Sequence, residues 1–212
     1  MLHSETAVWW LFLLASFLSG SLMFSQWLPR LFCRKDITQI SNDANPGATN
    51  VFIHCGPVMG MICLSLDLLK GFVPVYLCYH LLNPDRLWFA LVMAAPVLGH
   101  ALAPLAHFRG GKCIATSFGV LLALFPMTHI VLLLAGIYIV FSTMLKIHPN
   151  SSRSIVTFGL FGTISLLLLL HSGRYSIAGG CLLISAIVIY KHAKQTAAAE
   201  KKTLSHCGSP QS

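Results

Sequence analysis

Two polar loops carry the side chains in this sequence that are best suited to binding an anion. The first loop, DITQISNDANPGATN (residues 36–50), is rich in small and turn-forming residues. Successive backbone N–H groups in such a turn can form a nest for a phosphate, and Thr49 and Asn50 add side-chain donors. The same loop carries Asp43, whose negative charge opposes an anion. The loop is therefore either an altered phosphate pocket or an Asx-rich turn that leads into a helix.

The second loop lies within GHALAPLAHFRGGKCIAT (residues 99–116), where two glycines directly precede a lysine. Gly110 and Gly111 allow a close approach of the backbone, and Lys112 supplies a point charge of the kind that binds phosphate. A short GGK sequence also fits an ordinary basic loop at a membrane edge. Because two anion-suited loops support each other, we expect both to lie on the same face of the protein.

A few other polar side chains interrupt the apolar segments. Asp67 and Lys70 stand three residues apart in LSLDLLKGF, so they form either an internal ion pair that fixes helix packing or part of a catalytic site. His100 and His192 lie near the ends of expected helices. Either histidine could act as a general base, although a single histidine at a membrane boundary is more often interfacial.

The composition sets the class of protein. Of 212 residues, 56% are hydrophobic and 9% are charged, whereas a soluble domain holds about 25% charged residues. The chain cannot cover a globular surface with charge, so we predict an integral membrane protein. The net charge of +8 is expected from basic residues on the cytoplasmic face rather than from nucleic-acid binding. The scattered cysteines and histidines indicate neither a disulfide framework nor a metal site.

The apolar runs predict an all-α bundle of about seven membrane segments. They fall at about 7–29, 56–82, 87–106, 113–145, 154–171 and 176–190. The fourth run would make a helix of about 50 Å, against a hydrocarbon core of about 30 Å. Pro126 is the natural break, which gives a short or re-entrant helix over 113–125 and a full helix over 127–145.

The distribution of basic residues supports this break. With seven segments and the N-terminus outside, only Arg86 and Arg174 lie outside, and Lys70 lies within a helix. Without the break, basic residues fall almost equally on the two sides, contrary to the positive-inside rule. The remaining basic residues then lie inside: Arg30, Arg34, Lys35, Arg109, Lys112, Lys146, Arg153, Lys191, Lys194, Lys201 and Lys202.

The chain shows no internal repeat and no second domain. We expect a single membrane domain over residues 1–195, followed by a polar tail over residues 196–212 that is a frayed helix end and then disordered.

Several of these stretches resemble the bacterial acyl-phosphate:glycerol-3-phosphate acyltransferases. The resemblance covers residues 15–195, with the motifs in the order and spacing of that family. The matching stretches are GSL (20–22), DI (36–37), NPGATNV (45–51), LDLLKGFVPV (66–75), GH (99–100) with Pro104, and FRGGKCIATSFGVLLALFP (108–126).

The resemblance implies a multi-pass enzyme of the bacterial inner membrane, with its active-site loops and C-terminus in the cytoplasm. The family transfers an acyl group from acyl phosphate to the sn-1 hydroxyl of glycerol 3-phosphate, without a metal, a cofactor or a covalent acyl-enzyme. The product is lysophosphatidic acid. The resemblance implies catalytic roles for Asn45, Lys112 and His192. The substrate-binding positions that it suggests are Asp43, Gly47, Thr49, Asn50, His54, Gly110, Gly111 and Gln195.

Several positions depart from the family pattern, and four of them lie at expected substrate-binding positions or beside them. Asp43 replaces a serine, Ile53 replaces an arginine, Cys113 replaces a glycine and Gln195 replaces an asparagine. A like-charge contact at about 4 Å opposes phosphate binding by about 4 kcal/mol at an effective dielectric of about 20. The lost arginine adds roughly 1.5–3 kcal/mol.

These departures predict weak binding of glycerol 3-phosphate unless another cationic side chain compensates. The candidates for compensation are His54, Arg30 and Arg34. Three functions therefore stay open: an active acyltransferase of this family, a divergent paralogue with a lost or altered acceptor, and a small transporter unrelated to acyl transfer.

Overall fold

The computed structural model describes residues 2–207, and the side chains of residues 5–197 within them. All regular structure in this range is helical, which confirms the predicted fold class. The α-helices are α1 (Leu2–Ser21), α2 (Phe24–Phe32), α3 (Ile37–Ile40), α4 (Ala48–Cys55), α5 (Pro57–Leu81), α6 (Trp88–Leu102), α7 (Ile114–Leu122), α8 (Ile130–Ile139), α9 (Asn150–His171) and α10 (Tyr175–Cys207). A 3₁₀ turn, η1 (Pro104–Ala106), follows α6, and a π-helical turn, η2 (Val140–Met144), continues α8.

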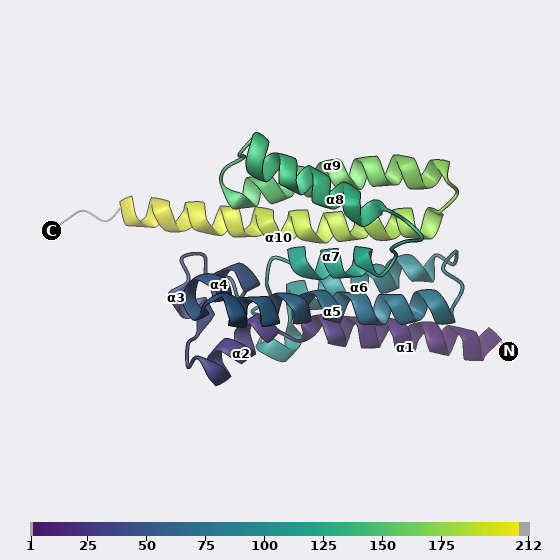
Figure 1. Cartoon of the computed structure of the whole chain (residues 1–212), viewed down its shortest axis with the longest axis horizontal. Coiled ribbons are helices and arrows are strands. Elements are labelled where there is room, and N and C mark those ends of the chain that lie inside the picture. The colour runs from purple at the N-terminus through teal and green to yellow at the C-terminus, as the bar shows by residue number, and fades with distance from the viewer. Residues whose placement is uncertain (1, 208–212) are drawn as a thin grey trace.

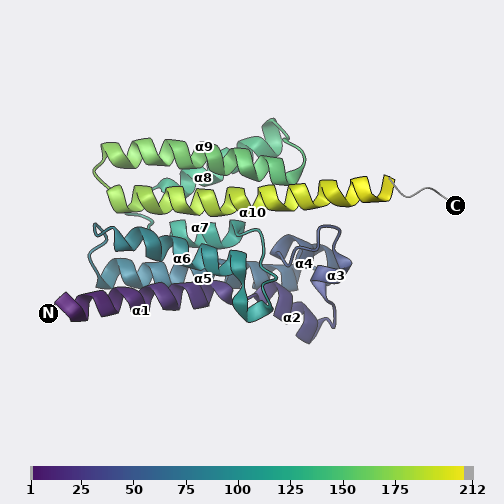
Figure 2. The same ribbon diagram turned by 180° about the vertical axis from the view of Figure 1, so that it is seen from behind.

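The long helices run side by side in two groups. Helices α1, α5, α6 and α7 form one group and α8, α9 and α10 form the other (Figure 1). Packing of α10 against α6 joins the two groups, and the same arrangement is seen from behind (Figure 2). The short helices α2, α3 and α4 lie at the end of the bundle towards which α10 extends.

Large apolar side chains cover the outside of this bundle. Leu11, Leu132 and Leu167 are each more than half exposed, at 65%, 57% and 65%. Helices that are apolar on all sides suit a lipid environment, where outward-facing leucines meet acyl chains rather than water.

Within the described residues, four helices are long and apolar enough to cross a membrane: α5, α6, α9 and α10. The first apolar run, which we expected to be one ordinary helix, is instead two helices bent by 42° at residues 22–23. Counting that pair as one span gives five. The remaining apolar helices, α7 and α8, are shorter, so the expected number of about seven membrane segments, one of them short or re-entrant, is not established.

The predicted break near Pro126 is present. Helix α7 ends at Leu122, and α8 begins only at Ile130. Proline has no N–H to donate and disfavours a helical conformation in the residue before it, so the long apolar run cannot continue as one helix. The break occupies more residues than we expected, which shortens both helices.

The C-terminal segment departs from the sequence-based expectation. Helix α10 continues to Cys207, through much of the tail that we expected to be disordered. Alanine, glutamine, glutamate and lysine in QTAAAEKK are strong helix formers, which explains the extension. Residues 208–212 lie outside the described range.

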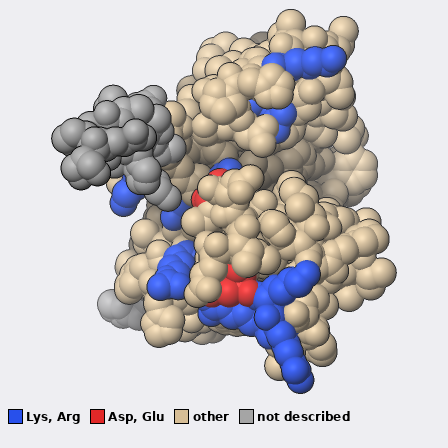
Figure 3. Space-filling view, turned by 90° about the vertical axis from the view of Figure 1, so that its left-hand side faces the viewer, with Lys and Arg blue, Asp and Glu red and all other residues tan. Residues whose placement is uncertain are grey.

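Most basic residues lie at one end of the bundle. The α2–α3, α6–α7 and α8–α9 connections meet at that end, and they carry Lys35, Arg109 and Lys146 among others. Figure 3 looks onto this end and shows Lys and Arg side chains around a hollowed centre, with fewer acidic side chains between them. Arg86 and Arg174 lie in the connections at the opposite end. The arrangement matches the charge asymmetry predicted for seven segments.

A buried ion-pair network connects α1, α2, α5 and α6. The Lys70 Nζ lies 2.8 Å from Asp67 Oδ1, 2.7 Å from His100 Nδ1 and 2.6 Å from the Leu22 carbonyl oxygen. Ser25 donates to the other Asp67 oxygen at 2.6 Å. The bend between α1 and α2 leaves the Leu22 carbonyl without a helical partner, so it is free to accept from the ammonium. Of the two alternatives for Asp67 and Lys70, the structure therefore shows the internal ion pair.

Glycines permit the close packing of α5 against α7. A Cβ at Gly119 would stand 2.0 Å from the Leu68 carbonyl oxygen, and a Cβ at Gly71 would stand 2.5 Å from that of Thr116. These backbone contacts leave no room for a side chain, and neither helix can shift without disturbing the other.

The Gly119→Ala substitution should therefore destabilise the protein by about 1–3 kcal/mol, the usual cost of overpacking. Thermal unfolding in detergent would measure this as a lowered midpoint. Gly136→Ala is the matched control, because no atom lies within 4 Å of its added Cβ. Equal midpoints for the two variants would contradict the packing described here.

The Lys70→Met substitution should cost about 3–5 kcal/mol, because it leaves the Asp67 carboxylate buried without its counter-ion. Adding Asp67→Asn should recover part of that loss, since no charge is then left unpaired. Thermal unfolding of the two variants, with Lys146→Met as an exposed control, measures both effects. A double variant that is less stable than Lys70→Met alone would show that the pair is not the source of the loss.

Candidate functional site

The two polar loops meet at the basic end of the bundle. Lys112 Nζ lies 2.6 Å from Asp43 Oδ2, across 69 residues of sequence. Both loops line one cavity of about 590 Å³, to which the first loop contributes Asn45, Gly47 and Thr49. The expectation that the loops share one face therefore agrees with the geometry.

The first loop is held by its own side chains. Asp43 Oδ1 accepts from the backbone N–H of Asn45 at 3.2 Å and from the side-chain amide of Asn50 at 2.8 Å. Asn50 also donates to the Asn45 carbonyl at 2.8 Å. A Cβ at Gly47 would stand 2.5 Å from the Asn45 side-chain nitrogen, so only glycine fits there without displacing that amide. The loop is thus an Asx-type turn that also lines the cavity.

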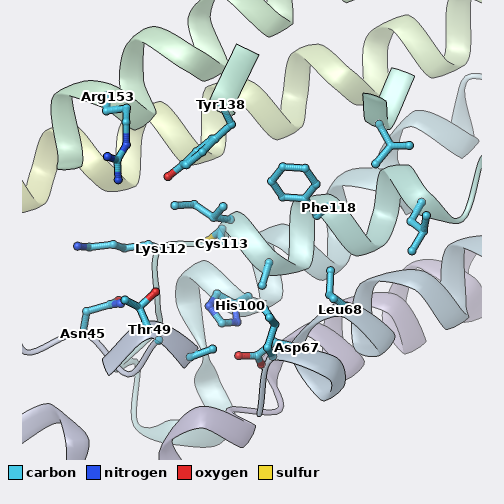
Figure 4. A pocket seen from close by; sticks show the side chains of 17 residues that line it. Asn45, Thr49, Asp67, Leu68, His100, Lys112, Cys113, Phe118, Tyr138 and Arg153 are labelled. Carbon is cyan, nitrogen blue, oxygen red and sulfur yellow. The ribbon is translucent and has the colours of Figure 1, made fainter. Parts of the chain in front are cut away.

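The second loop packs directly on the end of α6. A Cβ at Gly110 would stand 2.1 Å from the Ala101 carbonyl oxygen, and one at Gly111 would stand 2.4 Å from His100 Nε2. The Gly111 N–H donates to the His100 carbonyl at 3.2 Å. The two glycines are therefore needed for close approach to α6, and the contact directs Lys112 towards the cavity (Figure 4). Their role in binding a substrate stays a prediction.

His100 links this loop to the buried ion-pair network. An ammonium can only donate, so the His100 Nδ1 accepts from Lys70 and the ring proton resides on Nε2. The Nε2 side of the ring faces Gly111. His100 and Asp67 both line the floor of the cavity. The Asp67 carboxylate and the His100 Nδ1 are both bound to Lys70. His100 therefore supports the GGK turn, which packs on its ring.

The cavity has a polar end and an apolar end. Lys112, Arg153, Asn45 and Thr49 lie towards one end, whereas Phe118 lies deeper among α5, α7 and α8 (Figure 4). The further apolar lining residues are Leu64, Leu68, Ile114, Leu122 and Val131. Two cations at the mouth of an apolar cavity suit an amphiphile with an anionic head and a hydrocarbon tail.

Arg153 also lines the cavity, although the sequence predicted it only as one of the basic residues on the inside of the membrane. It lies in the first turn of α9, where its guanidinium carbon stands 5.6 Å from the centre of the Tyr138 ring. Its buried Nε has no hydrogen-bond partner among the described residues. No local motif marks this position, because α9 reaches the cavity only through the packing of α8 and α9.

Arg153 lines the cavity, whereas none of the three cations that we had considered for compensation, His54, Arg30 and Arg34, does so. Arg30 is paired with Asp36 at 2.6 Å, and Lys35 donates to the His54 carbonyl oxygen at 2.6 Å. Neither His54 nor Ile53 lines the cavity, and Ile53 is 69% exposed. Arg153, from a distant helix, is therefore an additional cation of this cavity, and the predicted weak binding of glycerol 3-phosphate stays a prediction.

His192 and Gln195 lie outside the cavity lining. The His192 ring is fully buried and lies against the backbone of Lys112. Both ring nitrogens, the Gln195 Oε1 and the Asn45 Oδ1 lack a hydrogen-bond partner among the described side chains.

The Asp43 carboxylate is ionised at neutral pH. Burial raises the pKa of Asp43, but hydrogen bonds from Lys112 and Asn50 outweigh burial and hold the pKa below the ordinary value of 3.8. The charge that we predicted to oppose an anion is therefore present, and it is paired with the lysine that we expected to bind phosphate.

Among the described residues, no group of three His, Cys, Asp or Glu side chains gathers as a metal site requires.

Comparison with known proteins gives a consistent family. Residues 10–201 match the family model described as glycerol-3-phosphate acyltransferase. A relative of that name from Listeria monocytogenes serovar 1/2a is 33% identical over 84% of this chain and 86% of its own length. Another from Hydrogenobaculum sp. is 32% identical over 85% of this chain and 89% of its own length.

Solved structures agree with these sequence matches. The crystal structure of PlsY, an integral membrane glycerol 3-phosphate acyltransferase in its glycerol 3-phosphate form, superposes with a TM-score of 0.75. That match has 26% identity and covers 92% of this chain and 93% of the other. The lysophosphatidic acid form gives a TM-score of 0.73 at 25% identity, with the same coverage. With the matching model, the curated relatives and the shared fold, this chain belongs to the glycerol-3-phosphate acyltransferase family.

Proposed function

We propose that this protein transfers an acyl group from acyl phosphate to the sn-1 hydroxyl of glycerol 3-phosphate. The observation that carries the proposal is the cavity with Lys112 and Arg153 at its polar end and apolar side chains beyond them. An acyl phosphate has the matching shape: a charged phosphate head on a hydrocarbon chain. Family membership and a neighbour crystallised with glycerol 3-phosphate support the same acceptor.

The reaction forms one C–O bond and breaks another. The acceptor hydroxyl oxygen attacks the carbonyl carbon of acyl phosphate, the bond from that carbon to the phosphate oxygen breaks, and inorganic phosphate leaves. The hydroxyl proton passes to a phosphate oxygen of the substrate, so no protein nucleophile is needed. Lysophosphatidic acid and inorganic phosphate are the products.

The chain's own residues supply charge and position. Lys112 and Arg153 stabilise negative charge that develops on the leaving phosphate and the carbonyl oxygen. Asn45 and Thr49 orient the phosphate or hydroxyl groups of the acceptor, and holding both substrates in one cavity supplies proximity. His192 acts through Lys112, since its ring lies against that residue's backbone.

Purified protein in detergent, given palmitoyl phosphate and glycerol 3-phosphate, should release inorganic phosphate and form lysophosphatidic acid. Lys112→Ala should lower kcat/KM by about 10²-fold, the usual effect of removing one group that stabilises transition-state charge. Arg153→Ala should lower it by at least about tenfold, the loss of one charged hydrogen bond.

Lys146→Ala is the control, because Lys146 is an exposed lysine at the same end of the bundle and lies outside the cavity lining. It should retain the wild-type rate. No phosphate release from wild-type protein, under conditions where a curated relative is active, would rule out the proposed reaction.

We also infer that the protein resides in the bacterial cell membrane with its basic end in the cytoplasm. The concentration of Lys and Arg at that end supports this orientation, because cytoplasmic loops carry the excess of basic residues. An alkaline phosphatase domain fused after Asp85 should then be active, since it would be exported, and one fused after Pro149 should be inactive. The opposite pattern would reverse the orientation.

A further inference from the structure

The Asp43 carboxylate binds donors at the polar end of the cavity, where Lys112 and Asn45 belong to the lining. One oxygen accepts from Lys112 at 2.6 Å, and the other accepts from Asn50 at 2.8 Å. The backbone N–H of Asn45 donates to that second oxygen at 3.2 Å. A carboxylate of the chain itself thus occupies the position where an anionic ligand would meet these groups.

This internal ion pair can be exchanged for another. The Asp43 side chain is 43% exposed and that of Lys112 is 20% exposed, so water reaches the pair. Exposed ion pairs are weak, because water and salt screen them. Asp43 is nevertheless tethered beside Lys112, and a tethered group has an effective concentration in the millimolar range. A free ligand that binds Lys112 no better than Asp43 does must therefore reach a similar concentration to displace it.

Arg153 has no such internal partner. The ion pairs of the described side chains join Arg30 to Asp36, Lys70 to Asp67, and Lys112 to Asp43. The Arg153 guanidinium therefore lines the same cavity without an acidic partner among those residues. A ligand that gains contacts to Arg153 as well as to Lys112 has an advantage that Asp43 does not match.

The difference in charge separates two kinds of amphiphile. A phosphoryl head carries up to two negative charges and three free oxygens, so it can serve both cations at once. A fatty-acid carboxylate carries one charge and two oxygens, and it offers Lys112 only what Asp43 already provides. Both molecules have hydrocarbon tails that would suit the apolar part of the cavity.

We propose that Asp43 is a specificity-determining residue that excludes fatty-acid carboxylates from the cavity and admits phosphate-bearing ligands. Phosphate displaces Asp43 from Lys112, whereas a carboxylate does not. In a membrane that contains free fatty acid, this exchange keeps the cavity available for a phosphorylated substrate. The inference rests on the proposed acyl-phosphate activity for its purpose, but the ligand selection itself is independent of turnover.

Asp43→Asn tests the exchange most directly, because an asparagine keeps an oxygen for the Asn45 N–H and the Asn50 amide while it removes the charge. Palmitate and inorganic phosphate serve as probes, with thermal unfolding in a mild detergent and inhibition of acyl transfer as two separate readouts. In wild-type protein, phosphate should raise the unfolding midpoint and palmitate should not. In Asp43→Asn, palmitate should bind and inhibit at concentrations up to about fivefold lower than in the wild-type protein. This factor corresponds to the loss of one exposed ion pair.

Asp36→Asn is the matched control, since it removes a different ion-paired carboxylate at the same end, outside the cavity lining. It should leave the palmitate response unchanged. Asp43→Ser gives a second test if the asparagine variant is poorly folded. In a Lys112→Gln background, Asp43→Asn should no longer change palmitate binding, because the carboxylate acts through Lys112.

Two outcomes would overturn the proposal. Palmitate binding that is equally strong in wild-type protein and in Asp43→Asn would show that Asp43 does not exclude carboxylates. Weaker phosphate binding in Asp43→Asn would show that Asp43 holds Lys112 in place for the ligand. Loss of the proposed acyltransferase activity is a separate result, since the unfolding measurement reports binding without turnover.

Discussion

The Lys70 ammonium is the buried charge on which the arrangement of the site depends. In an apolar bundle, an unpaired charge costs several kcal/mol, so the surrounding helices must present groups that satisfy it. The α1–α2 bend supplies the Leu22 carbonyl, α5 supplies Asp67, and α6 supplies His100. These contacts fix His100 beneath Gly111, and the loop that follows places Lys112 at the cavity. A buried charge beneath the cavity thus orders the segment that carries Lys112.

The cavity itself results from two kinds of packing. Glycines bring α5 and α7 into backbone contact, while the break after α7 turns the chain so that α8 and α9 can close the other side. Apolar side chains line the deeper part of the cavity, and the two polar loops line it at the basic end. An amphiphilic substrate can therefore keep its tail in an apolar environment while its head reaches cationic side chains.

The ion pair of Asp43 with Lys112 changes the meaning of a departure from the family pattern. Considered as a single residue, an aspartate in a phosphate loop predicts weak binding. In the folded protein, the aspartate is neutralised by Lys112, and Arg153 from α9 adds a further cation to the cavity. Net charge in the site is set by all the residues that converge there and not by one loop alone, so the weak binding of glycerol 3-phosphate stays a prediction.

Much of this protein follows from its sequence alone. The apolar runs determined the helices, and the charge asymmetry determined which ends lie together. Pro126 determined the interruption between α7 and α8. All three are local effects of hydrophobicity, charge and backbone geometry. The glycine and amide motifs likewise marked both loops and the family. Tertiary structure alone decided the α1–α2 bend, the partners of Lys70, the contribution of Arg153 and the pairing of Asp43 with Lys112. Lys70 and His100 are 30 positions apart in the sequence, and Asp43 and Lys112 are 69 positions apart. No local pattern encodes such pairings, since they arise only when helix packing brings distant segments to one place.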